Sequence, residues 1–367
     1  MLRRNGQQGL PGFAGAWTMA GVNPSQLIEP RVLAAWNLDP ESARPLGNGL
    51  INRTFIARDR AGCLRVLQQV NRLFPAKVNE DIEAVTAHLQ ARGLATPRLV
   101  RTLDGQLCLP APDGAWRVLT HVPGRVLDRM ENPAQARAAG ALLARFHRAL
   151  DDLEHTFRNV RPPIHQPSRR LAELEQALAA HPRHRLRRAA GALAEQVFAA
   201  AAALPALPDT PLRVMHGDPK ISNLVFAADS DAAVCMLDLD TLGRMALPFE
   251  LGDACRSWCS LSTEDDPRSR FSAELFAAAL DGYGSVARGW WLPEEAQAAV
   301  DATATIQVEL AARFCADSLN ECYFGWNPAL FATRGEQNLA RAQGQLAVHR
   351  SLLAQRERLD ALAASAG

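Results

Sequence analysis

The sequence predicts an α+β protein in which a small antiparallel sheet with one helix is followed by a larger, mostly helical part. Three observations support this prediction. Between residues 46 and 122, short runs rich in branched residues alternate with glycine turns. A single amphipathic helix interrupts those runs, and long alanine- and leucine-rich segments follow them. A chain that alternated strands with helices would predict a parallel sheet instead.

The first part contains several expected strands and one expected helix. The helix spans residues 76–92, because Ile82, Val85 and Leu89 fall on one face and Gly93 suits its C-terminal end. The expected strands are residues 54–57, 64–70, 98–103, 106–109 and 116–122.

The second part begins where Pro123-Gly124 breaks the strand pattern. Helices are expected over residues 133–151 and, as one or two segments, over residues 168–204. We therefore expect a loose leader at residues 1–24, absent if translation starts at Met19, a first lobe at residues 25–122, and a second lobe at residues 123–367.

Composition excludes several classes of protein. The 367 residues carry 40 Lys and Arg against 39 Asp and Glu, and this balance argues against a dedicated nucleic-acid binder. No apolar run is long enough to span a bilayer, and no secretion signal stands at the start. The seven scattered cysteines lack zinc-like spacing, which favours free thiols in a reducing compartment. We expect a cytoplasmic protein with no membrane or nucleic-acid partner; the sequence predicts no particular oligomeric state.

Polar residues that suit phosphoryl transfer gather in the segment His216-Gly217-Asp218-Pro219-Lys220-Ile221-Ser222-Asn223. An aspartate in a loop can accept a proton from an attacking hydroxyl, and an asparagine five residues later can bind a divalent cation. A hairpin then leads to Asp238, which would supply a charged metal ligand. Lys220 would offset the charge of the transferred phosphoryl group. The spacing matches the H-R-D-x-x-x-x-N loop of protein kinases, with Gly217 in place of the arginine.

A glycine turn precedes the first strand. Gly47 and Gly49, followed by Asn52, would let backbone N–H groups approach phosphate oxygens closely. A plain hairpin turn is the alternative meaning of such a pair of glycines.

In protein kinases a strand lysine, held by a helix glutamate, binds the nucleotide phosphates. Here the strand offers Arg65 and Gln68, and the helix offers Glu80 and Glu83. Glu83 more readily fits a solvated face. No Val-Ala-Ile-Lys motif is present, so the phosphate-binding cation is not identified by sequence.

The motifs GNGLINRTF (47–55), HGDPKISN (216–223) and LDLD (237–240), in this order, resemble those of the aminoglycoside phosphotransferase/choline kinase-like superfamily. The resemblance is closest to bacterial N-acetylhexosamine 1-kinases, and it covers residues 45–350. It implies a protein-kinase-like bilobal fold, use of ATP and Mg²⁺, and transfer to the anomeric hydroxyl of an amino sugar. We therefore expect residues 25–122 to form the nucleotide-binding lobe and residues 123–367 to carry the catalytic loop and the substrate site.

Residue by residue, the resemblance implies that Asp218 is the base and that Asn223 and Asp238 bind the metal. Arg313 and Tyr323 fall where that family contacts the sugar, and Glu80 resembles the family's helix glutamate. Leu50 and Gly217 stand where the family commonly has histidine and asparagine.

The sequence leaves two alternatives open. One is a kinase of another small alcohol, such as a cell-wall amino sugar, an aminoglycoside, choline or homoserine. The other is a catalytically silent, kinase-like nucleotide-binding protein. We also expect Asp253 to brace the catalytic loop by accepting backbone hydrogen bonds, with Arg256 as its partner one helical turn later.

Overall fold

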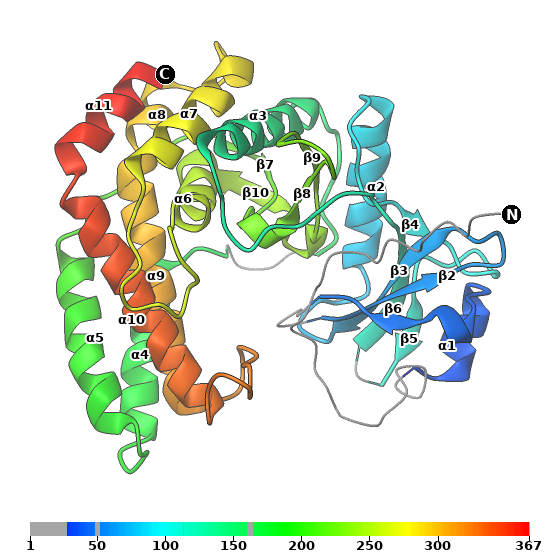
Figure 1. Ribbon diagram of the computed structural model, residues 1–367, viewed down its shortest axis with the longest axis horizontal. Coiled ribbons are helices and arrows are strands. Elements are labelled where there is room, and N and C mark those ends of the chain that lie inside the picture. Colours follow the sequence, from blue (N-terminus) through cyan, green and yellow to red (C-terminus); the bar gives the residue numbers. More distant parts are fainter. Residues whose placement is uncertain (1–27, 48–51, 113, 160–163, 367) are drawn as a thin grey trace, which may run out of the picture. The chain divides into compact units, whose positions relative to one another are not determined.

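The computed structural model describes residues 28–47, 52–112, 114–159 and 164–366. It divides into two compact units (Figure 1). The sheet unit comprises Met1–Leu73 and Val100–His121, and the helical unit comprises Phe74–Leu99 and Val122–Gly367. The leader expected at residues 1–24 lies outside the described residues.

A twisted sheet forms the centre of the sheet unit. Its strand order is β1-β2-β3-β6-β4, with β5 paired to β6, and the β1–β2, β2–β3, β3–β6 and β5–β6 pairs are antiparallel. The small antiparallel sheet that the sequence predicts is therefore confirmed. The strands are β1 (Arg44–Pro45), β2 (Arg53–Arg58), β3 (Leu64–Asn71), β4 (Leu99–Val100), β5 (Leu109–Ala111) and β6 (Gly114–Thr120).

One face of this sheet packs on the short helix α1 (Pro30–Ala35). Because side chains alternate along a strand, Phe55, Leu67 and Val118 point to the same face and form a core with Trp36. The indole of Trp36 also donates to the carbonyl of Val100 at 2.7 Å, which satisfies its polar atom. The opposite face therefore carries the intervening residues of β2, β3 and β6.

The helical unit is built around α9 (Ala299–Asn320), which is buried along most of its length. The helices α4, α5, α6 and α10 all pack against it (Figure 1). Two capping side chains show how local sequence sets the boundaries: Asn132 caps α3 and Thr333 caps α10. The remaining helices are α2 (Val78–Ala91), α3 (Pro133–Ala149), α4 (Pro167–Ala180), α5 (Arg187–Ala202), α6 (Leu247–Trp258), α7 (Ala273–Ala287), α8 (Pro293–Gln297), α10 (Arg334–Leu353) and α11 (Arg356–Ala366).

Helix α2 belongs to the helical unit, and a buried carboxylate helps to attach it there. Asp81 is 1% exposed and accepts hydrogen bonds from the backbone N–H groups of Arg158 and Asn159, at 2.7 and 2.8 Å. The imidazole of His155 lies 2.7 Å from the same carboxylate. One aspartate near the start of α2 thus ties this helix to the loop that follows α3.

Two short antiparallel ladders complete the helical unit. β7 (Leu212–Met215) pairs with β10 (Gly243–Ala246), and β8 (Leu224–Phe226) pairs with β9 (Ala233–Met236). These ladders hold the loops that carry the polar motif.

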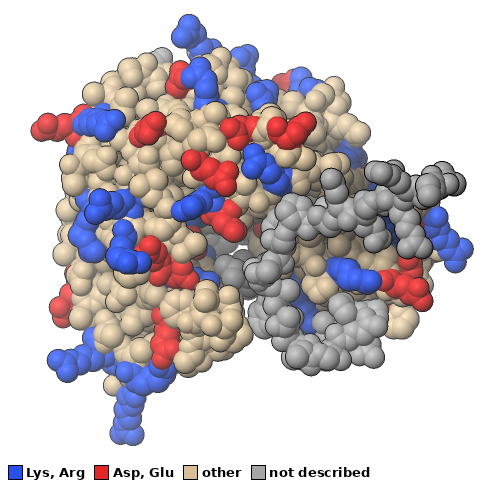
Figure 2. Space-filling view, viewed as in Figure 1, with Lys and Arg blue, Asp and Glu red and all other residues tan. Residues whose placement is uncertain are grey.

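On the face of the helical unit seen in Figure 2, acidic and basic side chains are interspersed, as the near-zero net charge suggests. None of the helices that the structure describes combines the length and apolar character that crossing a bilayer requires. All seven cysteines are free thiols.

Candidate active site

Two loops are brought together by the short ladders. Residues 216–223 connect β7 to β8, and residues 237–242 connect β9 to β10. The ladder pairs Met215 with Gly243 at one end and Leu224 with Met236 at the other. The start of the first loop is therefore held beside the end of the second, and the end of the first beside the start of the second. The polar side chains of the two loops face a common region. Chain connectivity alone would leave the two loops independent.

Asp218 is the centre of this region. The ammonium of Lys220 forms an ion pair with its Oδ2 atom. The side-chain amide of Asn223 donates to the backbone carbonyl of Asp218 at 2.8 Å and to its Oδ2 atom at 3.1 Å. The structure thus brings together three of the residues that the sequence singles out.

Charge pairing controls the protonation of both partners. Burial alone would raise the pKa of Asp218, but the adjacent Lys220 ammonium outweighs it and holds the pKa at about 2. Burial acts to lower the pKa of Lys220, yet the charges of Asp218 and Asp238 raise it well above its ordinary value. At neutral pH the loop therefore carries an ionised carboxylate beside a permanent cation.

Asp238 lies in the second loop and adopts a left-handed backbone conformation, with φ of 59°. The backbone N–H of the preceding residue, Leu237, donates to the carbonyl of Asn223 at 2.7 Å. This bond holds the start of the second loop, and with it Asp238, against the end of the first loop. The electrostatic influence of Asp238 on Lys220 is a second link between the two loops.

Asn223 and Asp238 offer the oxygen donors that a hard divalent cation prefers. Because the Asn223 nitrogen donates to Asp218, its amide oxygen is the atom available to a cation. Within the described parts of the chain, no group of three or more His, Cys, Asp or Glu residues could hold a metal by itself. A cation here would take its other ligands from phosphate oxygens and water, as Mg²⁺ commonly does in phosphotransfer sites.

His216 holds the two loops together rather than facing the chemistry. It is fully buried, and its Nε2 atom lies 2.7 Å from the carbonyl of Leu237. Burial lowers the pKa of His216, which favours the neutral imidazole with Nε2–H as the donor. The hydroxyl of Thr241 donates to the His216 carbonyl at 2.9 Å and adds a second link to the same loop.

Gly217 has a positive φ of 83° and leaves no room for a side chain. A Cβ atom at this position would lie 2.4 Å from the carbonyl oxygen of Thr241 and 2.8 Å from the Cδ1 atom of Ile164. The glycine in H-G-D is therefore required by close backbone contact in this fold.

Three side chains of helix α6 hold the loop at residues 216–223 by hydrogen bonds. Glu250 accepts hydrogen bonds from the backbone N–H groups of His216 and Gly217, at 2.8 and 2.9 Å. Near the end of the helix, the Ser257 hydroxyl accepts from the N–H of Ile221 at 3.0 Å, and the Trp258 indole donates to the Pro219 carbonyl at 2.8 Å. The loop is thus attached to one rigid helix along its length.

The expectation that Asp253 braces the loop is wrong, because Glu250 does so. The carboxylate of Asp253 instead accepts from the guanidinium of Arg256 at 2.8 Å, which confirms that pair. Arg256 also bonds Glu264 at 2.6 Å. One helical turn separates Glu250 from Asp253, and the packing of α6 decides which of them faces the loop.

Glu250 belongs to a buried polar chain that sequence reasoning missed. Its carboxylate lies 3.2 Å from Nε2 of His147, and Nδ1 of the same histidine lies 2.9 Å from the hydroxyl of Tyr283. Burial would raise the pKa of Glu250, but the hydrogen bonds from His147 and the loop backbone lower it. The brace therefore remains an ionised acceptor held by α3 and α7.

Arg313 and Tyr323 are brought together near the C-terminal end of α9. The guanidinium carbon of Arg313 lies 5.7 Å from the ring centre of Tyr323 and 5.4 Å from that of Phe324. Tyr323 is 40% exposed, so its ring is accessible to a ligand. This pair offers N–H donors and an accessible apolar ring face to a ligand.

A second buried carboxylate, Asp317, holds the segment that carries Tyr323. It accepts backbone hydrogen bonds from Cys322, Tyr323 and Phe324 at 3.0, 2.9 and 2.9 Å. The amide of Asn338 donates to it at 2.9 Å. Sequence reasoning missed Asp317, although an aspartate just before the end of a helix is a signal for capping interactions with the following turn.

Between the catalytic loop and Arg313 lies another polar pair. His165 follows Ile164, the residue that packs against Gly217, and its Nδ1 atom lies 3.3 Å from the carboxylate of Glu309. Glu309 precedes Arg313 by one turn of α9. Among the described residues, Nε2 of His165 and Oε2 of Glu309 are buried without a hydrogen-bond partner.

The nucleotide-binding candidates are distributed over different places. Gly47 has the positive φ of 70° that favours glycine, whereas Gly49 lies outside the described residues, as does Leu50. Asn52 is buried, and its side-chain Oδ1 atom accepts from the backbone N–H of Asn71 at 2.9 Å, so it fixes the start of β2.

Arg65 and Gln68 point to opposite faces of β3, because three positions separate them. Arg65 forms an ion pair with Asp59 at 2.7 Å. On α2, Glu80 is exposed and Glu83 forms an ion pair with Arg98 at 3.4 Å.

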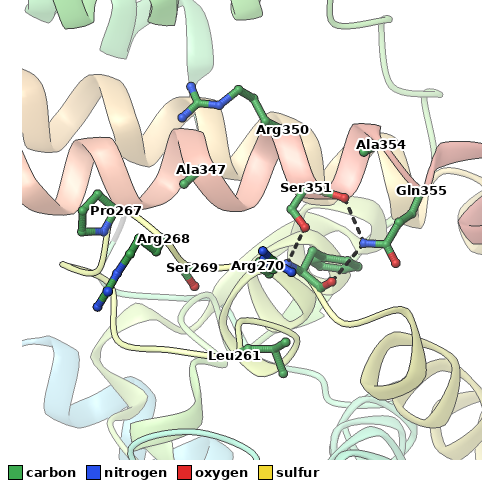
Figure 3. Close-up of a pocket in the computed structure, with 11 residues that line it drawn as sticks. Leu261, Pro267, Arg268, Ser269, Arg270, Ala347, Arg350, Ser351, Ala354 and Gln355 are labelled. Carbon is green, nitrogen blue, oxygen red and sulfur yellow. Dashed lines mark hydrogen bonds between the residues drawn. The ribbon is translucent and has the colours of Figure 1, made fainter.

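A cavity of about 660 Å³ lies between residues 261–271 and the end of α10 (Figure 3). The hydroxyl of Ser351 and the amide of Gln355 bond the backbone of Phe271 on its wall. The guanidinium groups of Arg268 and Arg350 point away from each other in this view. None of the catalytic candidates lines the cavity, so we do not place the reaction there.

Comparison with solved structures shows a protein-kinase-like fold. The amicoumacin kinase hAmiN, in complex with AMP-PNP, Ca²⁺ and Ami, matches with a TM-score of 0.59 at 15% identity, over 86% of this chain and 92% of that chain. A microcompartment-associated aminopropanol kinase matches with a TM-score of 0.57 at 14% identity, over 89% and 96%. Choline kinase from Cryptosporidium parvum Iowa II matches with a TM-score of 0.54 at 12% identity, over 90% and 93%.

These likenesses show that the chain has a kinase-like fold. The sequence model of the phosphotransferase enzyme family matches residues 42–297, and the chain belongs to that family. This confirms the resemblance to the aminoglycoside phosphotransferase/choline kinase-like superfamily.

Proposed function

We propose that this protein transfers the γ-phosphoryl group of MgATP to a hydroxyl group of an N-acetylhexosamine. The single observation that carries phosphoryl transfer is the arrangement at Asp218, whose carboxylate meets both the ammonium of Lys220 and the amide of Asn223. The loop is held by α6, so the three groups are positioned before substrate binds.

Asp218 is proposed to orient the acceptor hydroxyl and to receive its proton. A carboxylate whose pKa is about 2 is a weak base, so it would take the proton late, as the bond to phosphorus forms. Orientation is therefore its larger contribution. Lys220 remains protonated, and its ammonium group would change partner from Asp218 to the phosphoryl oxygens as they approach.

Asn223 and Asp238 are the proposed ligands of Mg²⁺. When bound, the ion neutralises charge on the β- and γ-phosphates. These residues fit Mg²⁺ because they offer one amide oxygen and one carboxylate. The two loops that carry them are joined by the hydrogen bond between Leu237 and Asn223. In the wider family, one structural neighbour carries Ca²⁺ with AMP-PNP, which is the kind of pair this site would hold.

The proposed acceptor is an amino sugar whose amine is acetylated, phosphorylated at its anomeric hydroxyl. Arg313 stacked beside the accessible ring of Tyr323 supports this choice, since an aromatic face packs on a sugar ring and a guanidinium donates to its oxygens. The positive charge of Arg313 would repel a cationic acceptor such as choline or an aminoglycoside. An acetylated amine is neutral and avoids that repulsion.

A panel assay tests the acceptor. Purified protein is incubated with MgATP and separately with N-acetylglucosamine, N-acetylgalactosamine, choline, 3-aminopropanol, homoserine and an aminoglycoside, and ATP consumption is measured. Products are then examined by ³¹P NMR, in which an anomeric phosphate shows coupling to the neighbouring proton. We expect turnover with an N-acetylhexosamine and an anomeric phosphate product.

Each other outcome has a defined meaning. Turnover with choline, an amino alcohol or an aminoglycoside, and none with either sugar, would refute the sugar acceptor and retain phosphoryl transfer. Binding of MgATP by thermal shift without turnover on any acceptor would favour a silent nucleotide-binding protein.

A further inference from the structure

One buried polar pair in the helical unit has no part in the transfer step. Nδ1 of His165 lies 3.3 Å from Oε1 of Glu309, and the two residues are 6% and 1% exposed. The other polar atom of each side chain, Nε2 of His165 and Oε2 of Glu309, is buried without a hydrogen-bond partner among the described residues. Native proteins rarely leave such atoms unsatisfied, because each loses its hydration without a compensating bond.

His165 is held beside the catalytic loop by two contacts. The preceding residue, Ile164, lies against Gly217, since a Cβ atom on that glycine would be 2.8 Å from the Cδ1 atom of Ile164. The imidazole ring of His165 stacks on the ring of Phe249, with ring centres 6.0 Å apart and planes 6° from parallel. Phe249 precedes Glu250, which bonds the backbone of the loop. The pair is therefore attached to the same elements that position the chemistry.

Glu309 begins a polar row along one face of α9. Arg313 follows four positions later and Asp317 another four, and residues four apart lie on the same side of a helix. The guanidinium of Arg313 lies beside the ring of Tyr323, and Asp317 holds the turn that carries that ring. The row therefore leads from His165 to the segment proposed to contact the acceptor.

The neighbours of the pair are partly exposed, although the pair itself is buried. They are Ile164, which is next to His165 in the chain, Phe249, which stacks on it, and Arg313, which is one turn from Glu309. These neighbours form part of the surface of the helical unit. A ligand that displaced one of their side chains would meet the polar atoms of the pair.

The hydrogen-bonding character of the pair selects the kind of group that it would bind. A carboxylate only accepts hydrogen bonds, so Nδ1 carries the proton in the bond between His165 and Glu309. In the neutral imidazole Nε2 is then an acceptor, and Oε2 of Glu309 is a second acceptor. Two acceptors match two O–H donors, which neighbouring hydroxyls of a sugar supply. An ammonium group would also donate twice, but the guanidinium of Arg313 one turn away would repel it.

We propose that His165 and Glu309 bind two neighbouring hydroxyl groups of the acceptor sugar, other than the hydroxyl that is phosphorylated. This inference rests on the proposed sugar acceptor and extends it. Arg313 and Tyr323 would contact the sugar ring, and the buried pair would distinguish sugars by their hydroxyl groups. A sugar that lacked one of these hydroxyls would leave a buried acceptor atom unsatisfied and would bind more weakly.

Kinetics with deoxy sugars test this assignment. Whichever of N-acetylglucosamine and N-acetylgalactosamine is phosphorylated is compared with its 3-deoxy, 4-deoxy and 6-deoxy analogues, and KM and kcat are measured for wild type and Glu309→Gln. The variant should raise KM for the parent sugar at least about tenfold, the loss expected of a hydrogen bond to a charged group, with KM for ATP unchanged. At least one analogue should show a similar rise with wild type. For that analogue Glu309→Gln should add less than about twofold, because the bond is already lost.

Two further variants separate binding from structure. His165→Phe/Glu309→Met replaces the pair by apolar side chains and keeps an aromatic ring against Phe249. It should fold with a Tm no lower than wild type, and its KM should be the same for the parent sugar and the deoxy analogues. Gln307→Met is the matched control: it removes buried polar atoms that also have no partner among the described residues, from a position about 200° around the same helix. Its KM values should equal those of wild type.

Four results would overturn the assignment. They are an unchanged KM for the sugar in folded Glu309→Gln, equal losses in that variant for the parent sugar and all three analogues, a parallel rise in KM for ATP, and discrimination between the sugars that persists in the double variant. If the double variant does not fold, Glu309→Gln and the analogues decide the question. Wild-type protein that phosphorylates neither sugar would refute the proposed acceptor and this assignment together, whereas those four results leave the proposed function standing.

Discussion

Two buried carboxylates hold the two parts of the candidate site, and they do so in different ways. Glu250 accepts from the backbone of His216 and Gly217, more than 30 positions earlier in the chain. Asp317 accepts from the backbone of Cys322, Tyr323 and Phe324, five to seven positions later. The anchor of the loop with Asp218 joins distant segments, whereas the backbone bonds of Asp317 are local and one bond from Asn338 of α10 adds to them.

This difference has a physical consequence. Glu250 depends on the packing of α3, α6 and α7, because His147 and Tyr283 complete its hydrogen bonds. Disturbing it should affect the whole helical unit. Asp317 organises one turn at the end of α9 and is bonded to Asn338 of α10 rather than to the loop with Asp218, so we expect the segment that carries Tyr323 to change without disturbing that loop. We infer that the chemistry is built into the fold and that acceptor preference is set locally.

The largest expected effect is on the chemistry itself. Asp218→Asn keeps the size of the side chain but removes its charge and its capacity to accept a proton. We expect kcat to fall by roughly 10²–10⁴-fold, the range typical of a general base, while MgATP still binds. Steady-state kinetics with the acceptor from the panel and calorimetry with MgATP measure the two quantities. Unchanged turnover would contradict the role of Asp218.

The next effect concerns the long-range anchor. Glu250→Gln removes the charge that receives two backbone N–H groups and the imidazole of His147, and we expect a loss of about 1–3 kcal/mol in unfolding free energy. Because the catalytic loop loses its brace, kcat should also fall while KM for the acceptor changes little. Urea unfolding and steady-state kinetics measure both. Glu274→Gln, an exposed residue at the start of α7, is the control; equal behaviour of the two variants would contradict the brace.

The local anchor should give a smaller and more selective effect. Asp317→Asn retains one acceptor oxygen and loses the charge, so part of the turn at residues 322–324 is released. We expect KM for the acceptor to rise about tenfold, corresponding to the loss of one net hydrogen bond, with KM for ATP unchanged. If KM rises equally for both substrates, Asp317 does not act on the acceptor segment alone, and the contrast with Glu250 fails.

The smallest effect is expected from pH. The folded pKa of Asp218 is about 2, and the pKa of Lys220 is raised, so both remain charged at neutral pH. Between about pH 5 and 8, neither group should contribute a limb to the profile of kcat, and changes from this source should stay below about twofold. A limb in that range that disappears in Lys220→Met would contradict this.

Stability should respond to acid in a defined direction. Since the pKa of Asp218 is depressed on folding, its contribution is present above about pH 4 and is lost as the pH falls towards 2. The lowered pKa of Glu250 acts in the same direction. Thermal melts across this range should show a decreasing Tm as pH falls.

Much of the fold could be predicted from the sequence, because it depends on local patterns. The helix expected at residues 133–151 is α3 at Pro133–Ala149, capped by Asn132, and the helix expected at residues 76–92 is α2 at Val78–Ala91. The spacing from Asp218 to Asn223 also indicated a phosphotransferase, since one loop holds both residues. These features need only neighbouring positions in the chain.

What only the tertiary structure decided are the partners from distant segments. Glu250 and Asp253 look alike in sequence, and the orientation of α6 gives the bracing role to Glu250. Likewise, Arg117 is an unremarked arginine until the register of β3 and β6 places it against Gln68. Sequence determined which elements form and which loop gathers Asp218, Lys220 and Asn223, because those follow from periodicity and local spacing. Packing and register, which arise from contacts between distant residues, decided which side chains hold that loop.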